Sequence, residues 1–173
     1  MSMIQVRQES SEDYRAIEVV HLSAFEGDDE VGLVDALRES SGFIPELSLV
    51  AEFNGRIVGH ILLTKVKLLQ GKESIDILVL APMAVVPSQS HRGIGSELVT
   101  AAVDKAIASG YKAIAVVGSP EFYQRFNFER ADKWGLQTNL SVSNDLVSAM
   151  ELEKGIFDNG GNIVYPSLFN CVY

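Results

Sequence analysis

The sequence predicts one mixed α/β domain, built on a sheet that begins with antiparallel strands and ends in a parallel pair. The chain has 173 residues, 47% of them hydrophobic, which is enough for one buried core and short for two. Three long β-prone runs follow one another, and a helix and a further strand come next. We treat residues 1–173 as one domain, with a core at about residues 4–154 and residues 155–173 as a tail packed on it.

The segment before these runs predicts a short strand and two helices. Residues 4–7 alternate apolar and polar side chains, as a strand does. Ser11 is the expected cap of a helix about 14 residues long, whose apolar residues recur at helical spacing. A second helical pattern runs from Val31 to Leu37 and ends before Gly42.

Three antiparallel strands are predicted next. They are expected at residues 47–53, 56–69 and 74–86, joined by turns at residues 54–55 and 70–72. The Asn-Gly pair of the first turn tolerates the positive φ that a tight hairpin demands. Pro82 has no N–H to donate to the sheet, so we expect the third strand to be bulged or splayed from Ala81 to Met83.

The clearest helix is predicted after Gly93, and it closes with Gly110. A buried strand follows at residues 113–118, and a strand, helix, strand order of this length favours parallel pairing with the preceding strand. Ser119 caps a short helix that extends to Phe126. The apolar stripe of the long helix consists of Ile94, Leu98, Val99, Ala102, Val103, Ala106 and Ile107. The last predicted strands are residues 135–140 and 148–153, ahead of a glycine-rich tail.

The composition argues against several classes of function. The formal net charge is −9 and the pI is about 4.8, whereas a protein that coats nucleic acid needs an excess of clustered Lys and Arg. Cys171 is the only cysteine, so we expect no intrachain disulfide and no cysteine metal site. We find no leader-like N-terminal pattern and no apolar run of about 20 residues, so we expect a cytoplasmic protein that does not enter membranes.

The stretch VPSQSHRGIGSELV, residues 86–99, places two glycines directly before the long helix. A Walker A loop would need Lys and then Ser or Thr after its last glycine, and a dinucleotide fingerprint would need a third glycine where Leu98 stands. The Gly-x-Ser-x-Gly motif of hydrolases is absent, and the three histidines have no metal-ligand spacing. Two interpretations are left: a phosphate held by backbone amides, or a glycine-rich helix start that binds nothing.

The order of elements around this loop resembles the GCN5-related N-acetyltransferases (GNAT). The resemblance covers nearly the whole chain and is strongest from Ile75 to Phe128, where a proline-containing strand, the glycine loop, a helix, a parallel strand and the sequence FYQRFNF follow one another. The segments VGHILLTKV, LAPMAVVP, VVGSPEFYQRFNF and SAMELEKG are similar to a bacterial subgroup of predicted acetyltransferases labelled YhbS-like. The resemblance implies the GNAT fold, in which acetyl-CoA binds between two diverging parallel strands.

The resemblance also implies where acetyl-CoA would bind. Its pyrophosphate would lie on the glycine loop, mainly on main-chain N–H groups, and its pantetheine arm would pair with the strand before the loop. The first position of the family's motif is Gln or Arg, and Ser90 stands there in this chain, so we expect a weakened but functional site. The expected cofactor-binding residues are Met83, Ala84, Val85, Ser90, His91, Arg92, Gly93, Ile94, Gly95 and Ser96.

Two catalytic roles follow from the same resemblance. The N–H of Met83 would stabilise the oxyanion at the thioester carbonyl. Tyr123 would protonate the departing thiolate, although a packed core tyrosine is the alternative interpretation. Asn127 replaces the glycine that commonly follows this tyrosine in the family, and Asn tolerates the left-handed conformation such a turn requires.

The sequence leaves the general base open. Glu30 is the first candidate, because the start of the second helix would lie near the acceptor cleft in this fold, although an acid is also favoured there by the helix dipole. Glu52, Asp76 and His60 are the alternatives. A single histidine in an apolar strand is more often a hydrogen-bonded core residue than a base.

The implied function is that of an acetyl-CoA-dependent N-acetyltransferase, which moves an acetyl group to a primary amine by direct attack in a ternary complex and needs no metal. A non-catalytic acyl-CoA-binding or sensing module and a transferase for another acyl group are the alternatives. The acceptor would be the amine of a small molecule, a peptide or a protein, and the acidic loop at residues 26–30 is compatible with a cationic one. Nucleic acid and membranes are not expected partners, and a homodimer is the commonest oligomer.

Overall fold

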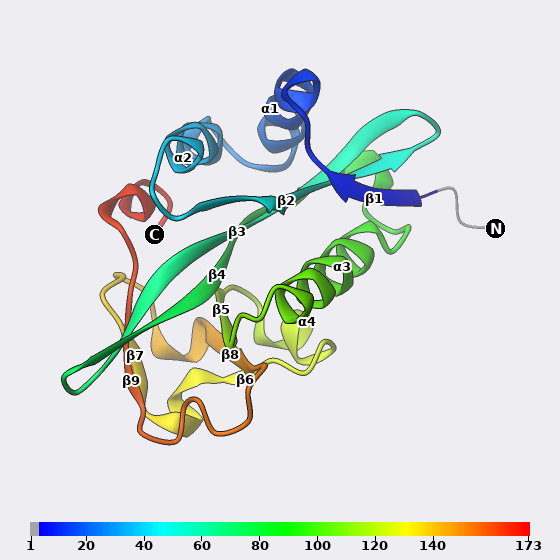
Figure 1. The fold of residues 1–173 in the computed structure, drawn as a ribbon. Coiled ribbons are helices and arrows are strands. Elements are labelled where there is room, and N and C mark those ends of the chain that lie inside the picture. Colours follow the sequence, from blue (N-terminus) through cyan, green and yellow to red (C-terminus); the bar gives the residue numbers. More distant parts are fainter. Residues whose placement is uncertain (1–3) are drawn as a thin grey trace.

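A computed structural model of the chain describes residues 4–173, and this part forms one open sheet of nine strands with helices on both faces (Figure 1). The strands are β1 (Ile4–Gln8), β2 (Phe43–Phe53), β3 (Arg56–Gln70), β4 (Glu73–Val85), β5 (Ala113–Val117), β6 (Glu129–Arg130), β7 (Leu136–Thr138), β8 (Val147–Glu151) and β9 (Gly161–Val164). The α-helices are α1 (Tyr14–Ala24), α2 (Asp29–Arg38), α3 (Ile94–Ala108) and α4 (Pro120–Gln124). The strand order is β1-β2-β3-β4-β5-β8-β6, and β9 pairs with both β3 and β7.

The pairing of the strands confirms the predicted mixed sheet. β1 to β4 pair antiparallel in chain order, and β4 then pairs parallel with β5 over a short stretch that ends at Leu80 and Val116. Asn54 and Gly55 have positive φ angles of 53° and 78°, as the predicted hairpin turn requires. The parallel pair depends on the crossover through α3, because a tight turn can join only antiparallel neighbours.

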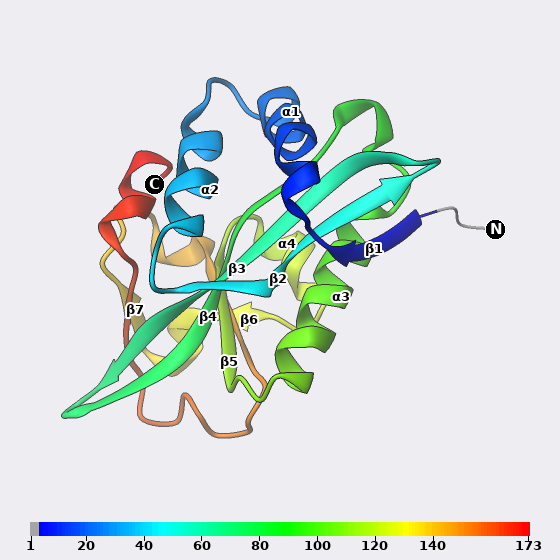
Figure 2. The ribbon, with the colours of Figure 1, turned by 45° about the horizontal axis from the view of Figure 1, so that its top comes forward.

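Two hydrophobic layers hold the helices against the sheet. In Figures 1 and 2, α1 and α2 cover one face, with α2 beside the C-terminal segment, and α3 lies on the opposite face. The first layer joins Leu33 and Leu37 of α2 to the sheet and to Phe169 near the C-terminus. The second layer joins Leu98 and Ala102 of α3 to the other face of the sheet. Removing these side chains from water supplies the main favourable term in folding.

The strand β4 is irregular where its proline predicts a bulge. β3 pairs regularly with β4 up to Leu80 and again from Met83, but Ala81 and Pro82 between them oppose a single residue of β3. The peptide bond between Ala81 and Pro82 is cis. Because the pairing with β5 also ends at Leu80, β4 and β5 diverge directly beyond the bulge.

The helix α3 confirms the predicted helix, with one correction. It begins behind Gly93 (φ 76°), and Gly110 (φ 82°) follows its C-terminal end. Its buried residues are Ile94, Leu98, Val99, Ala102 and Ala106. Val103 is half-buried, but Ile107 is 55% exposed and does not belong to the apolar stripe. Successive helical residues point about 100° apart, so Ile107 turns to solvent beside the buried Ala106.

Two predicted boundaries near the N-terminus are wrong. The cap is Ser10, not Ser11: its N–H donates to the carboxylate of Asp13 at 2.8 Å in a capping box, and residues 11–13 form a 3-10 turn ahead of α1. The strand β2 begins at Phe43, earlier than predicted, because a shift in its register with β3 accommodates Pro45.

The C-terminal part has more strands than the sequence predicts. β6 and β9 were not predicted, and β7 is shorter than the run at residues 135–140. β9 pairs antiparallel with β3 and parallel with β7, which brings the tail back to the sheet. A Cβ at Gly161 would lie 2.7 Å from the carbonyl oxygen of Leu69, so this approach requires glycine. A 3-10 helix at Ser167–Cys171 then lies beside α2 (Figure 1).

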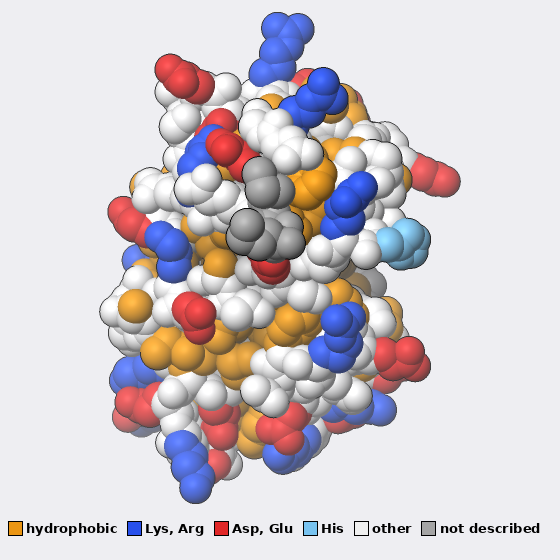
Figure 3. Space-filling view, turned by 90° about the vertical axis from the view of Figure 1, so that its right-hand side faces the viewer, with side chains coloured by type: hydrophobic (Ala, Val, Ile, Leu, Met, Phe, Trp, Pro, Cys, Tyr) orange, Lys and Arg blue, Asp and Glu red, His pale blue; other side chains and the backbone are white. Residues whose placement is uncertain are grey.

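The face that carries the N-terminal strand shows a band of hydrophobic side chains, with acidic and basic side chains interspersed around it (Figure 3). Within residues 4–173, no helix is long and apolar enough to cross a membrane. In the same described range, no three or more His, Cys, Asp or Glu side chains are grouped so that they could hold a metal ion.

Candidate functional site

A cavity of about 310 Å³ opens where β4 and β5 diverge. One half of its lining comes from these strands and α4, namely Leu80, Ala81, Pro82, Met83, Val117 and Tyr123. The other half, which we call the helix side, consists of Phe25, Glu30, Leu33, Val172 and Tyr173. The structure therefore brings the three candidate catalytic residues, Met83, Tyr123 and Glu30, to a single cavity.

Tyr123 lines the cavity from α4, which begins at Pro120 as predicted. The side chain is 8% exposed and packs so closely on Gly118 that a Cβ there would lie 3.0 Å from the ring. Burial raises the pKa of the Tyr123 hydroxyl, and Tyr173 raises it further, so the hydroxyl is protonated at neutral pH. The turn after α4 contains Asn127 with a φ of 72°, which confirms the predicted left-handed conformation.

Glu30 reaches the cavity from the first turn of α2, where it is half-buried. Burial raises the pKa of Tyr173 to about 12, and the negative charge of Glu30 contributes to this increase. In the described part of the chain, Glu30, Tyr123 and Tyr173 form no hydrogen bond or ion pair through their side chains. One carboxylate and two phenol hydroxyls are therefore left for a ligand.

The main chain of β4 offers further donors beside the cavity. The N–H of Val86 donates to the carbonyl oxygen of Val58 in β3 at 2.8 Å. Successive N–H groups of a strand point to opposite sides, so those of Val85 and Met83 point away from β3. The pairing with β5 ends at Leu80, which leaves this edge of β4 open.

The glycine loop lies next to the same strand. A Cβ at Gly95 would lie 3.7 Å from Phe122 and 4.0 Å from the end of Met83, so the loop and the cavity are adjacent. The N–H groups in the first turn of α3 have no partner within the helix. Two other amides of this region are already used: those of Ser90 and Arg92 donate to the carbonyls of residues 87 and 89, at 3.2 and 3.3 Å.

The side chains of the loop are mostly open to solvent. Ser90, His91 and Arg92 are exposed, and the guanidinium of Arg92 lies 4.8 Å above the ring of Phe53. Ser96 accepts a hydrogen bond from Arg125 at 3.2 Å. These side chains could add charge and hydrogen bonds to a phosphate, while the backbone amides provide the closest approach.

The other candidate bases lie away from the cavity. Glu52 accepts a hydrogen bond from Arg7 at 2.8 Å, and Asp76 forms an ion pair with Lys67 across the β3–β4 hairpin. His60 is completely buried and hydrogen-bonded. None of the three lines the cavity. The interpretation of His60 as a core residue is confirmed, and Glu30 is the candidate base that the cavity retains.

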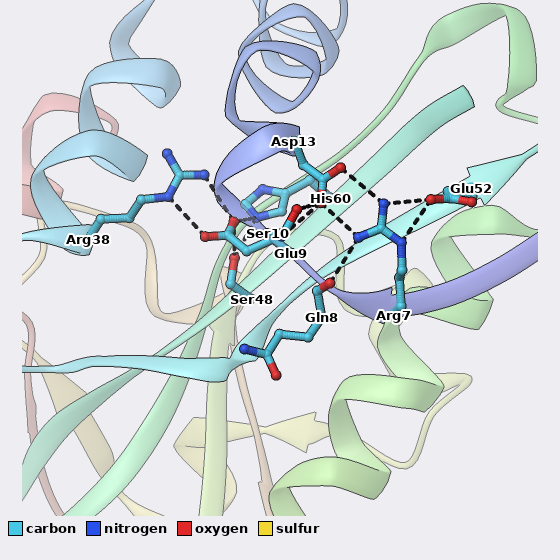
Figure 4. A network of polar contacts seen from close by, with 9 residues as sticks. All are labelled: Arg7, Gln8, Glu9, Ser10, Asp13, Arg38, Ser48, Glu52 and His60. Carbon is cyan, nitrogen blue, oxygen red and sulfur yellow. Dashed lines mark hydrogen bonds and ion pairs between the residues drawn. The ribbon is translucent and has the colours of Figure 1, made fainter. Parts of the chain in front are cut away.

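His60 belongs to a buried polar network that joins α1 and α2 to the sheet (Figure 4). Arg38 of α2 donates two hydrogen bonds, at 3.0 and 2.9 Å, to the carboxylate of Glu9 after β1. Ser48 of β2 donates to this carboxylate at 2.6 Å, and its oxygen lies 2.9 Å from Nε2 of His60. Nδ1 of His60 lies 2.8 Å from Nε2 of His21 on α1.

These partners set the direction of each hydrogen bond. Because Ser48 uses its hydrogen for Glu9, His60 donates through Nε2 to Ser48 and accepts at Nδ1 from His21. Both histidines are neutral, since burial lowers the pKa of each, to about 3 for His21. Burial opposes ionisation of Glu9, but contacts with His60, Arg38 and Ser48 outweigh it and lower its pKa to about 2.

Sequence reasoning missed most of the helix side of the cavity. Phe25 directly follows α1, and Val172 and Tyr173 come from a tail that has no motif or periodicity. The positions of Val172 and Tyr173 depend on how the tail returns to the sheet, and no local sequence pattern predicts that return. Gly118 was also missed, although a glycine directly after a buried strand is a known sign of close approach by another group.

Comparison with known proteins places this geometry in a family. A model of the acetyltransferase (GNAT) family matches residues 6–128. Two Escherichia coli K12 proteins described as uncharacterized N-acetyltransferases are similar in sequence. YjhQ is 33% identical over 117 residues, 68% of this chain and 65% of YjhQ, so the match spans just under two thirds of that relative. YhbS is 35% identical over 127 residues, 73% of this chain and 74% of YhbS.

Solved structures show the same fold over nearly the whole chain. Escherichia coli YhbS in complex with CoA has a TM-score of 0.90 at 27% identity, covering 98% of this chain and 93% of that one. A GNAT family acetyltransferase from Brucella melitensis in complex with acetyl-CoA has a TM-score of 0.75 at 24% identity, covering 98% and 99%. This second similarity concerns the fold alone.

Proposed function

Because the chain belongs to the GNAT family of acetyltransferases, we propose that it transfers the acetyl group of acetyl-CoA to a primary amine by direct attack in a ternary complex. The observation that carries the proposal is the convergence of Glu30, Tyr123 and the Met83 amide on one cavity at the divergence of β4 and β5. The CoA bound to YhbS supports the choice of co-substrate.

The residues of this chain fit acetyl-CoA in two places. The N–H groups of Met83 and Val85 on the open edge of β4 suit an extended arm that carries its own amides, as pantetheine does. The free amides from Gly93 to Ser96 suit a pyrophosphate at the start of α3. Arg92 has its N–H bonded to Gln89, so we assign it a contribution through charge rather than through its amide.

Acetyl-CoA supplies an acetyl group activated by a thioester bond. Glu30 accepts a proton from the amine, directly or through water, so that the neutral nitrogen can attack the acetyl carbonyl carbon. Met83 donates its N–H towards the carbonyl oxygen, where negative charge develops. Tyr123 gives its proton to the sulfur as the carbon–sulfur bond breaks, and its raised pKa keeps it protonated until that step. The attacking nitrogen then gives up its extra proton, through water, to the Tyr123 oxygen, which leaves a neutral amide, a free thiol and a protonated Tyr123.

Release of free thiol from acetyl-CoA tests this function. The purified protein is incubated with acetyl-CoA and primary amines, amino acids, polyamines or peptides, and the N-acetyl product is identified by mass spectrometry. We expect thiol release that requires both the protein and a primary amine. Tertiary amines of similar shape serve as controls, because they cannot form an amide. Tight binding of acetyl-CoA without thiol release in the presence of any amine would contradict the proposal.

A further inference from the structure

We propose, on the basis of the function above, that the acceptor is a primary amine with a single positive charge, an apolar or aromatic body and no carboxylate. The proposal rests on the chemistry of the helix side of the cavity, which meets the reacting groups of β4 and α4 within one space of about 310 Å³. A space of this size, shared with the end of acetyl-CoA, admits a small molecule or one extended side chain.

The charges around the cavity are of one sign. In the part of the chain that the structure describes, Glu30 is the single acidic residue that lines the cavity, and no Lys, Arg or His lines it. Tyr123 and Tyr173 are protonated because burial raises the pKa of each. The carboxylate of Glu30 attracts the ammonium group of a ligand. A carboxylate on the ligand would instead lose its water beside Glu30 and find no cationic partner there.

The walls of the helix side are apolar. Phe25, Leu33 and Val172 have no polar side-chain atoms, and Tyr173 presents an aromatic ring. An alkyl or aryl group of the ligand binds favourably against such a surface, because its apolar surface is removed from water. Among the described residues that line the cavity there is no second carboxylate for a second ammonium on the ligand, so diamines should fit less well than monoamines.

Hydrogen-bond donors are also left unused at the same place. The Tyr123 side chain is 8% exposed, lines the cavity, and has no hydrogen-bond partner for its hydroxyl within the described residues. This hydroxyl is open to the cavity and bonded to no group of the described residues, so it is free to donate to a ligand with an acceptor atom beside it. The acetyl thioester and the attacking nitrogen together provide such atoms.

Matched pairs of amines test the proposal. 2-Phenylethylamine and phenylalanine differ by one carboxylate, and butylamine and 1,4-diaminobutane differ by one ammonium. We expect kcat/KM for acetyl transfer to be about 100-fold higher or more for 2-phenylethylamine than for phenylalanine. We expect butylamine to exceed 1,4-diaminobutane about tenfold. Equal values within either pair, or the reverse order, would overturn the assignment.

A binding measurement separates this proposal from the proposed function. In the presence of CoA, 2-phenylethylamine is titrated calorimetrically into the wild-type protein and the variants Glu30→Gln and Glu39→Gln. Glu39 is exposed at the other end of α2 and serves as the matched control. We expect Glu30→Gln to weaken binding about tenfold or more and Glu39→Gln to leave it unchanged.

The outcomes of the two experiments are distinguishable. Binding of the monoamines in the expected order without acetyl transfer would support the ligand class and overturn the proposed function. Acetyl transfer that favours amino acids, diamines or peptides would support the function and overturn the ligand class. Amine binding that is unaffected by Glu30→Gln would also overturn it.

Discussion

The network around His60 and the cavity around Tyr123 both bring together polar side chains from the helices and the sheet, yet these side chains are partnered differently. In the network, the carboxylate of Glu9 meets two donors of Arg38 and the hydroxyl of Ser48. In the cavity, the side chains of Glu30 and Tyr123 have no hydrogen-bond partner within residues 4–173.

This difference separates structural from functional polar groups. A buried charge that is fully bonded inside the protein has no capacity left for a substrate, and removing one of its partners mainly destabilises the fold. A polar group that lines a cavity without a partner can act on a ligand, and its loss should affect activity more than stability. Variants in each region should therefore produce opposite effects on stability and turnover.

Arg38→Met is expected to have the largest effect on stability. It leaves the carboxylate of Glu9, whose side chain is 4% exposed, without its two strongest donors. The free energy of unfolding, measured by urea denaturation at neutral pH, should fall by about 3–5 kcal/mol. Lys133→Met is the control, because it breaks an exposed ion pair with Glu129 and should change stability by at most about 1 kcal/mol. A similar small loss for both variants would show that the network contributes no more than a surface pair.

Tyr123→Phe should show the opposite pattern. Loss of the hydroxyl removes the proposed acid and leaves the packing of the ring against Gly118 intact. We expect kcat to fall about 100-fold, with little change in acetyl-CoA affinity or in the free energy of unfolding. The half-buried Tyr111, which does not line the cavity, provides the control variant Tyr111→Phe. Unaltered turnover of Tyr123→Phe at every pH would exclude the acid role.

The network also predicts how stability depends on pH. Burial lowers the pKa of His21 from 6.5 to about 3, and the pKa of His60 is lowered in the same direction. Below pH 6.5 the histidines of the unfolded chain bind protons that the buried histidines of the folded chain do not bind. The free energy of unfolding therefore falls as the pH decreases below 6.5. Glu9, with its pKa lowered from 4.5 to about 2, adds to the loss below pH 4.5.

Urea denaturation between pH 7.5 and 4.5 measures this dependence. Each neutral buried histidine contributes up to about 1.4 kcal/mol per pH unit, so His21→Gln should flatten the slope by at most that amount. His91→Gln changes an exposed histidine and should leave the slope as it is. Equal slopes for the wild-type protein and His21→Gln would contradict the assignment of His21 as neutral.

Local rules explain the parts of the fold that the sequence predicted. Asn54 and Asn127 adopt the positive φ angles that their side chains tolerate, and Pro82 lies in the bulge that its missing N–H requires. The order of such elements carried the resemblance that implied the GNAT fold. Pro45 shows the limit of these rules, because a register shift allowed the strand to extend past it.

The candidate site was predictable only on one side. Met83 and Tyr123 lie in segments whose motif and spacing resemble a family. Phe25 and Tyr173 come from segments with no motif, and only the return of the tail through β9 brings Tyr173 to the cavity. The partners of His60 were equally hidden, because they are distant in sequence and belong to different elements.

The smallest expected effect concerns Ser90, which stands where the family's motif has Gln or Arg. Its side chain is exposed on the loop beside α3, whereas the side-chain oxygen of Gln89 is buried and has no hydrogen-bond partner among the described residues. Gln89 therefore does not present this atom on the exposed side of the loop. Ser90→Gln should add about one hydrogen bond to a phosphate and raise acetyl-CoA affinity two- to tenfold by calorimetry. Ser88→Gln, also exposed on this loop, should have no effect, and an unchanged or lower affinity for Ser90→Gln would mean that the pyrophosphate does not lie at residue 90.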